Sequence, residues 1–291
     1  MNRKIRVIVI TIMILILTFT VSTYAWLQLN SVNVLELSLD GMVYGQEIKE
    51  NDLGRTIRNH KLFDVTTQDG KIFTQGLSKQ EAKPGIHYIA FDLYFRVKPT
   101  TQEKTDNEVL RYIYLIDKKS PTYEDRLKAE GTYAVSKGMS WKSPVTFNNG
   151  DQLIEKGQSH RYYAQDALRI GFNNESHHFI YDISENEERG FGKPYGALDY
   201  YQKMTGEHIT PPNKPQTIYQ LTPTDPYRPY EAVNDDSLVA TLEDGKDGYY
   251  YGKTTVNIWI EGWDADSFDA IIKDQVYIQL KFRALRRSNI N

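Results

Sequence analysis

The sequence contains no cysteine, so no disulfide stabilises the fold and no thiolate can serve as a nucleophile or a metal ligand. It also lacks an excess of either charge, because 35 basic and 38 acidic residues are interspersed and give a formal net charge of -3. A basic surface for polyanions is therefore not expected. We predict no nucleic-acid partner, and contact with a membrane only through the N-terminal segment.

Catalytic motifs are missing as well. The sequence shows no nucleophile elbow, no P-loop and no dinucleotide-binding glycine fingerprint. Among the histidines only His177 and His178 are close in sequence, and neighbours on a strand point to opposite faces, which makes them poor joint ligands for one metal. We therefore expect that the protein is not an enzyme. A hydrolase that uses two carboxylates is the alternative, because the separation of such groups is set only by the fold.

The N-terminus has the pattern of an export signal. Three basic residues lie before position 7, and a nearly unbroken apolar run extends from Val7 to Phe19. A small residue follows in an A-x-A-like position, which predicts a signal peptide of residues 1–25, cleaved by signal peptidase between Ala25 and Trp26. The alternative is an uncleaved anchor over residues 7–27, about the 20 residues that a bilayer requires. In either case we expect a secreted protein, outside the cell or at its surface.

The rest of the chain, residues 26–291, alternates polar and apolar residues with a period of two, the pattern of half-buried antiparallel strands. The clearest strand is predicted over residues 88–98 and the next over residues 276–283. Weaker strands are predicted over residues 32–39, 111–117, 167–172, 178–183, 237–242 and 254–261. Helical patterns are limited to residues 123–130, 198–204 and 268–272.

These strands predict an all-β protein: a single antiparallel β-sandwich with jelly-roll-like topology over residues 26–291, preceded by the hydrophobic signal helix. Six prolines lie within residues 210–236. Proline has no N–H to donate to a strand neighbour, so this segment cannot be central sheet, and we interpret it as a surface insert. It is either a tolerated loop or a binding loop on a rigid scaffold.

The most distinctive local string is residues 256–271, where four carboxylates follow a predicted strand within nine positions. They are Glu261, Asp264, Asp266 and Asp269. Calcium takes about 6–8 oxygen ligands, so the string is a candidate calcium site, although the spacing is not that of an EF-hand. The structural alternative is that Asp264 or Asp266 caps a short helix over residues 267–272, with Trp263 and Phe268 packed beneath the sandwich.

The stretch Ser-Thr-Tyr-Ala-Trp at residues 22–26, followed by the strand around residues 34–39, resembles the N-terminus of the TasA/camelysin family of Gram-positive secreted proteins. In that family a Thr-aromatic-Ala-aromatic motif closes the signal peptide and a "leu-asp-leu" strand opens the mature domain. Residues 167–172 and 258–266 are also similar to segments of clostridial and bacillar surface proteins that carry this leader. The resemblance implies a jelly-roll-like sandwich, a dedicated signal peptidase, and assembly into biofilm matrix fibres by passing an N-terminal strand to a neighbour.

Two functions are expected from these features. The favoured one is an exported structural protein of the cell surface or extracellular matrix, which associates with itself or with other matrix proteins by exchange of the strand at residues 31–39. This strand carries apolar residues on both faces, so it is unsuited to a solvated edge. The alternative is a monomeric extracellular binding module that recognises glycan or protein through residues 249–251 and the proline-rich insert.

Overall fold

The computed structural model describes residues 32–38, 65–75, 79–97, 110–228, 230–245, 247–272 and 274–287, with residues 32–38 described as backbone only. The predicted signal helix, its cleavage site at Ala25 and Trp26, and the alternative anchor lie outside these ranges. Within the ranges, no helix has the length and apolar character that a membrane span needs.

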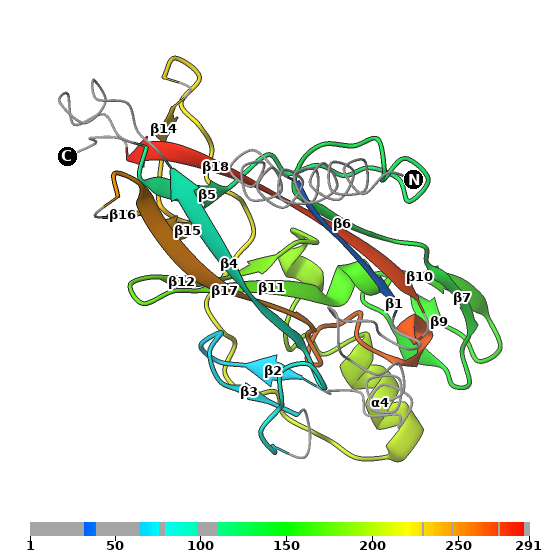
Figure 1. Cartoon of the computed structure of the whole chain (residues 1–291). Helices are drawn as coiled ribbons and strands as arrows, with labels where there is room; N and C mark the ends of the chain where they lie inside the picture. The colour runs from blue at the N-terminus through cyan, green and yellow to red at the C-terminus, as the bar shows by residue number, and fades with distance from the viewer. Residues whose placement is uncertain are drawn as a thin grey trace, which may run out of the picture.

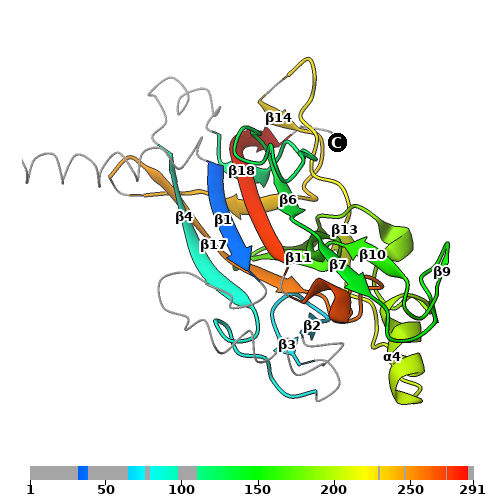
Figure 2. The ribbon, with the colours of Figure 1, turned by 90° about the vertical axis from the view of Figure 1, so that its right-hand side faces the viewer.

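Most described segments are β-strands, which pair into two main sheets (Figures 1 and 2). The first has the order β1 (Val32–Ser38), β18 (Gln275–Arg287), β5 (Tyr112–Leu115) and β15 (Leu238–Thr241), with β6 (Tyr133–Ser136) and β14 (Glu231–Ala232) also paired to β18. The second has the order β13 (Thr217–Ile218), β12 (His178–Asp182), β11 (Leu168–Asn173), β17 (Tyr250–Ile260) and β16 (Glu243–Asp244), with β4 (Ile89–Val97) also paired to β17.

Three two-stranded ladders complete the sheet structure. They are β2 (Thr66–Thr67) with β3 (Phe73–Thr74), β7 (Met139–Lys142) with β10 (Ser159–Tyr162), and β8 (Phe147–Asn148) with β9 (Leu153–Ile154). The helix α4 (Ala197–Thr205) and the β2–β3 hairpin lie at one end of the main sheets, and β14 lies at the opposite end (Figures 1 and 2). The all-β prediction is confirmed, whereas the jelly-roll topology remains a prediction.

The hydrophobic core lies between the two sheets. In β4, Ile89 and Phe95 are buried while Asp92, Tyr94 and Arg96 are exposed, which confirms the alternation predicted for this strand. The inward side chains of β18 come from the other sheet and are Val276, Ile278, Leu280 and Phe282. The rings of Phe95 and Phe282 meet edge to face with centroids 5.5 Å apart, so this pair joins the sheets directly.

The second face of β18 does not have the solvated character that alternation predicts. Tyr277 and Gln279 are buried because the chain between β5 and β6 covers them. The Gln279 side chain donates to the carbonyl of Ala129 (3.0 Å) and accepts from the Tyr133 hydroxyl (2.8 Å). That covering segment contains the helix predicted over residues 123–130, which is wrong: the chain forms turns there. The helix predicted over residues 198–204 is confirmed as α4.

In its described residues, the proline-rich insert (210–236) forms only two-residue strands at the margins of the sheets. β13 pairs in parallel with β12, and β14 pairs in parallel with the last residues of β18. The insert therefore runs from the second sheet to the first. Its absence from the centre of either sheet agrees with the missing donors of its prolines.

Candidate functional site

The acidic segment, residues 261–269, follows directly on β17. Its two large aromatic side chains, Trp263 and Phe268, are buried, as the structural interpretation of this string predicted. The predicted helix is reduced to a 3-10 turn over Asp269–Ile271, and Phe268 stands at its N-cap position with no side-chain cap. Capping by Asp264 or Asp266 is therefore wrong. Asp264 instead accepts a hydrogen bond from the N–H of Asp266 (2.9 Å).

Each of the four carboxylates has its own protein partner. Glu261 accepts from the indole of Trp259 (3.0 Å) and from the N–H of Trp263 (3.2 Å). The other three carboxylates are held by Arg169, Arg189 and the hydroxyl of Tyr200, which bind Asp264, Asp266 and Asp269 respectively.

The structure does not bring these four side chains together as ligands of one ion. Among the described residues no group of three or more His, Asp or Glu side chains could hold a metal. Calcium binding by residues 261–269 stays a prediction, and the contacts favour a structural role.

Arg169 is the centre of a buried ionic cluster. Its side chain lies within 2.7 Å of Asp182 and contacts Asp264, and all three residues are almost fully buried. Glu261 adds a third negative charge to the same surroundings. One guanidinium cannot neutralise three carboxylates, and burial raises the pKa of Asp264 to about 8 even though Arg169 opposes the shift. Burial raises the pKa of Glu261 as well.

A second ionic group lies beside it. Arg189 belongs to the 3-10 turn Glu187–Arg189 and donates to Asp266 through Nε (3.0 Å) and to the carbonyl of Asn149 through Nη1 (2.6 Å). This guanidinium therefore ties three separate segments together. Burial, reinforced by the negative charge of Asp266, raises the pKa of Asp166 to about 7. Neither arginine was predicted as a partner, since each lies far along the chain from the carboxylate it binds.

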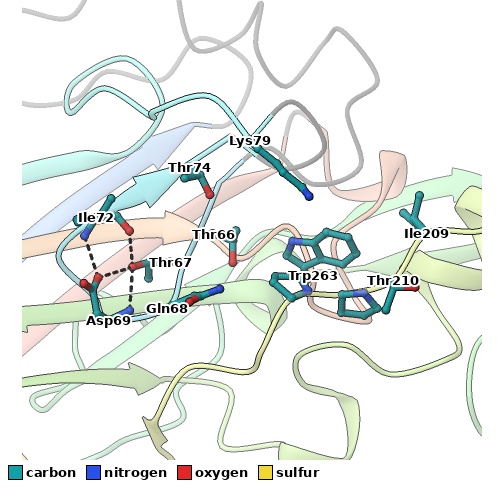
Figure 3. A pocket seen from close by; sticks show the side chains of 12 residues that line it. Thr66, Thr67, Gln68, Asp69, Ile72, Thr74, Lys79, Ile209, Thr210 and Trp263 are labelled. Carbon is teal, nitrogen blue, oxygen red and sulfur yellow. Dashed lines mark hydrogen bonds between the residues drawn. The ribbon is translucent and has the colours of Figure 1, made fainter.

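A cleft of about 840 Å³ lies next to the acidic segment, between the β2–β3 hairpin and residues 209–212 (Figure 3). The hairpin side presents mainly polar side chains: Thr66, Thr67, Gln68, Asp69, Thr74 and Lys79, together with Ile72. The other side is mainly apolar, with Ile209, Thr210, Pro211, Pro212 and Trp263. Its size falls within the range of about 300–1,000 Å³ that small-molecule sites occupy.

The hairpin is held by its own turn. The Asp69 carboxylate accepts hydrogen bonds from the N–H groups of Lys71 (2.8 Å) and Ile72 (2.9 Å), and Thr67 Oγ1 accepts one from Gly70 (2.9 Å). Partial burial opposes ionisation of Asp69, but the hydrogen bonds from Ile72 and Lys71 prevail and hold its pKa below the usual value. The carboxylate of Asp69 thus serves the turn, and the aspartate-glycine pair at residues 69–70 was its sequence signal.

Comparison with known proteins found no match. No family model matches the chain, and neither a curated protein nor a solved structure does. Function must therefore be inferred from the strands, the ionic groups and the cleft.

The tyrosines at residues 249–251, named above as a binding loop, lead into β17. Tyr250 is buried at the start of this strand, and the hydroxyl of Tyr251 donates to Asp247. The rings of Tyr249 and Tyr251 lie 6.3 Å apart, and the guanidinium of Arg96 lies over the Tyr249 ring. These contacts describe a packed hairpin, so the cleft offers a better site for a ligand than this loop does.

The third feature is the strand β1 at the edge of the first sheet. β1 runs antiparallel to β18, with seven register pairs from Val32 opposite Lys281 to Ser38 opposite Gln275. In the described part of the chain β18 is its only strand partner. Figure 2 shows β1 along one side of β18, with the edge strand β4 of the other sheet nearby.

Proposed function

We propose that the protein is an exported structural protein of the cell surface or extracellular matrix, which assembles when copies exchange the strand β1. The observation that supports this best is the position of β1, which among the described residues is the first strand and lies at a sheet edge, where it pairs with residues 275–281 of β18. A strand in this position can leave its own sheet without threading through another element.

Exchange conserves the contacts that the strand makes. Departure of β1 leaves one side of β18 unpaired over those seven positions, and an unpaired edge is a template for a strand from another chain. The β1 of a neighbour restores the same main-chain hydrogen bonds in the same register, so the equilibrium depends mainly on protein concentration and on the connection to the rest of the chain. The apolar residues on both faces of this strand, evident in the sequence, disfavour a state in which it is left in water.

The register provides a sharp test, since the natural chain has no cysteine. The N–H of Lys281 donates to Thr132 Oγ1 (3.0 Å) and its carbonyl accepts from the N–H of Ile116 (3.0 Å), so both groups point away from β1. Val32 and Lys281 therefore form a non-hydrogen-bonded pair, whose Cα atoms lie about 4.5 Å apart in antiparallel ladders. That separation suits a disulfide.

We therefore expect mature chains that carry Val32→Cys and Lys281→Cys to form covalent multimers on oxidation. A mixture of the two single variants should give a disulfide between chains that joins position 32 of one copy to position 281 of another, identified by mass spectrometry of the linked peptides. The matched control pairs Val32→Cys with Gln275→Cys, which lies six positions, or about 20 Å, along β18 from the matched residue. It should form no such product.

Strand exchange is refuted if the double variant forms only an intramolecular disulfide while the mature chain stays monomeric at high concentration. That result would favour the second candidate function, a monomeric extracellular binding module. The observation in favour of this second function is the cleft of about 840 Å³, to which the proline-rich insert contributes Pro211 and Pro212.

A further inference from the structure

We infer that the cleft between the β2–β3 hairpin and residues 209–212 is a saccharide-binding site, which takes an uncharged sugar ring between the polar hairpin side and the apolar side around Trp263. The site is separate from β1 and does not depend on strand exchange.

The two sides of the cleft match the two characters of a pyranose ring. Such a ring has a face of C–H groups, which packs on apolar and aromatic surfaces, and a rim of hydroxyls, which needs hydrogen-bonding partners. Ile209, Pro211 and Pro212 are half-buried and provide most of the accessible apolar surface, whereas Trp263 is only 5 % exposed and forms the base. Gln68 and Lys79 extend toward Trp263 from the hairpin side (Figure 3). Clefts that combine apolar walls with a few polar groups are the usual form of small-molecule sites.

The polar groups at the rim are available to a ligand. Gln68 and Lys79 are exposed and Thr74 is half-buried. Among the described residues, none of these three side chains takes part in a hydrogen bond or an ion pair. The neighbouring side chains differ in this respect, because Thr67 and Asp69 are committed to the hairpin turn.

The base of the cleft is rigid. The N–H of Trp263 donates to Glu261 (3.2 Å), and its carbonyl accepts from the N–H of Gly192 (2.7 Å). Gly192 has φ +72°, and a Cβ built on it would lie 3.3 Å from Pro211, so the glycine allows the proline segment to approach closely. A pre-formed wall of this kind lowers the entropic cost of binding.

Other ligand classes fit less well. An extended peptide would bind most readily by adding a strand, but the hairpin edges are already engaged by the bridges of Val65 to Glu261 and of Thr74 to Glu81. A phosphate or carboxylate ligand would need several cations, and the lining has one, Lys79. A divalent cation would need several carboxylates, and the lining has one, Asp69, which is already bound to the hairpin backbone.

The test uses the mature full-length chain and a panel of neutral oligosaccharides built from glucose, mannose, galactose and N-acetylglucosamine. Binding is measured by titration calorimetry and by saturation-transfer NMR. We expect at least one member to bind, and the double variant Gln68→Ala with Lys79→Ala to weaken that binding about tenfold or more, because two hydrogen-bonding groups are lost. The matched control is Gln152→Ala with Lys156→Ala, two exposed residues near the β8–β9 hairpin, which should bind as the natural chain does.

A second variant, Thr74→Trp, keeps Gln68 and Lys79 but fills the cleft from β3, and it should abolish binding while the thermal unfolding curve shows a folded protein. The inference is refuted if no panel member binds, or if both cleft variants bind with unchanged affinity. Binding of an extended peptide that the panel saccharides do not displace would also refute it and would assign the cleft to a protein partner.

Discussion

Replacement of Asp166 by asparagine should make the protein more stable at alkaline pH, although it removes a charged group beside Arg189. Burial, and the negative charges of Asp266 and Asp274, raise the pKa of this carboxyl from 3.8 to about 7, and Arg189 only partly opposes the shift. A folded-state pKa above the unfolded value means that the carboxyl stabilises the fold most below pH 3.8 and that this contribution is lost as the pH rises through about 7.

The size of the effect follows from the same pKa values. Complete ionisation of a carboxyl shifted from 3.8 to about 7 costs at most about 4 kcal/mol relative to its neutral form. Asp166 is half-buried, so solvent screens part of this cost, and we expect Asp166→Asn to gain about 2 kcal/mol at pH 8. Asparagine resembles the neutral carboxyl in shape and remains neutral throughout, so the gain should shrink toward zero near pH 4.

Urea unfolding followed by tryptophan fluorescence at pH 4, 6 and 8 measures this difference directly. The matched control is Asp244→Asn, at an exposed position of β16, where we expect a change within about 0.5 kcal/mol at each pH. The reasoning fails if Asp166→Asn destabilises the protein at pH 8, or if its effect is the same at all three pH values. Either outcome would mean that the ionised carboxylate is compensated by Arg189.

Three further outcomes are expected. Arg169→Met should lower the free energy of unfolding by about 3–5 kcal/mol in the same urea assay, since it leaves buried carboxylates without their cation. Arg228→Met, which breaks an exposed ion pair, is the control and should change the free energy of unfolding by less than about 1 kcal/mol. The melting temperature should be equal in chelator and in millimolar calcium. A rise in calcium would instead establish ion binding at residues 261–269, because a ligand at 100 times its Kd adds about 2.7 kcal/mol to the free energy of unfolding. Deletion of residues 26–39 should leave a folded domain by circular dichroism that elutes as a monomer, and unfolding of this variant would show that β1 is needed within its own sheet.

The strands that could be predicted are those whose burial alternates along the strand itself. β4 follows from its own residues, because a period of two fixes which side chains face the core. β11 was also predicted as a strand, but it is buried on both faces except at its last residue, which alternation does not show. The β7–β10 ladder was missed, since its strands are short and mostly polar. Its large apolar or aromatic residues are limited to Met139, Trp141 and Tyr162. The burial of Tyr277 was missed for a different reason: it depends on the covering segment between β5 and β6, which alternation within β18 cannot show.

The cleft could not be predicted because its sides come from distant parts of the chain. Gln68 and Trp263 lie far apart in the sequence, and neither local sequence indicates that the two residues are close in the fold. The proline-rich insert was recognised as a feature, but its approach to the β2–β3 hairpin is a property of the fold. The carboxylates of residues 261–269 were recognised too, but their partners Arg169 and Arg189 could not be predicted because they lie on other elements.

The acidic segment and the cleft are parts of one arrangement. Glu261 holds the backbone N–H of Trp263, and the next two carboxylates are fastened to Arg169 and Arg189, which belong to separate segments of the chain. Each of these contacts fixes the loop on either side of Trp263, the residue at the base of the cleft. The contacts that favour a structural role for these carboxylates therefore also position the indole. We therefore interpret the acidic residues as a clamp that fixes Trp263. We expect Asp266→Asn to reduce the free energy of saccharide binding by more than it reduces the free energy of unfolding. If this variant binds saccharide with the affinity of the natural chain, the contact between Asp266 and Arg189 does not influence the cleft.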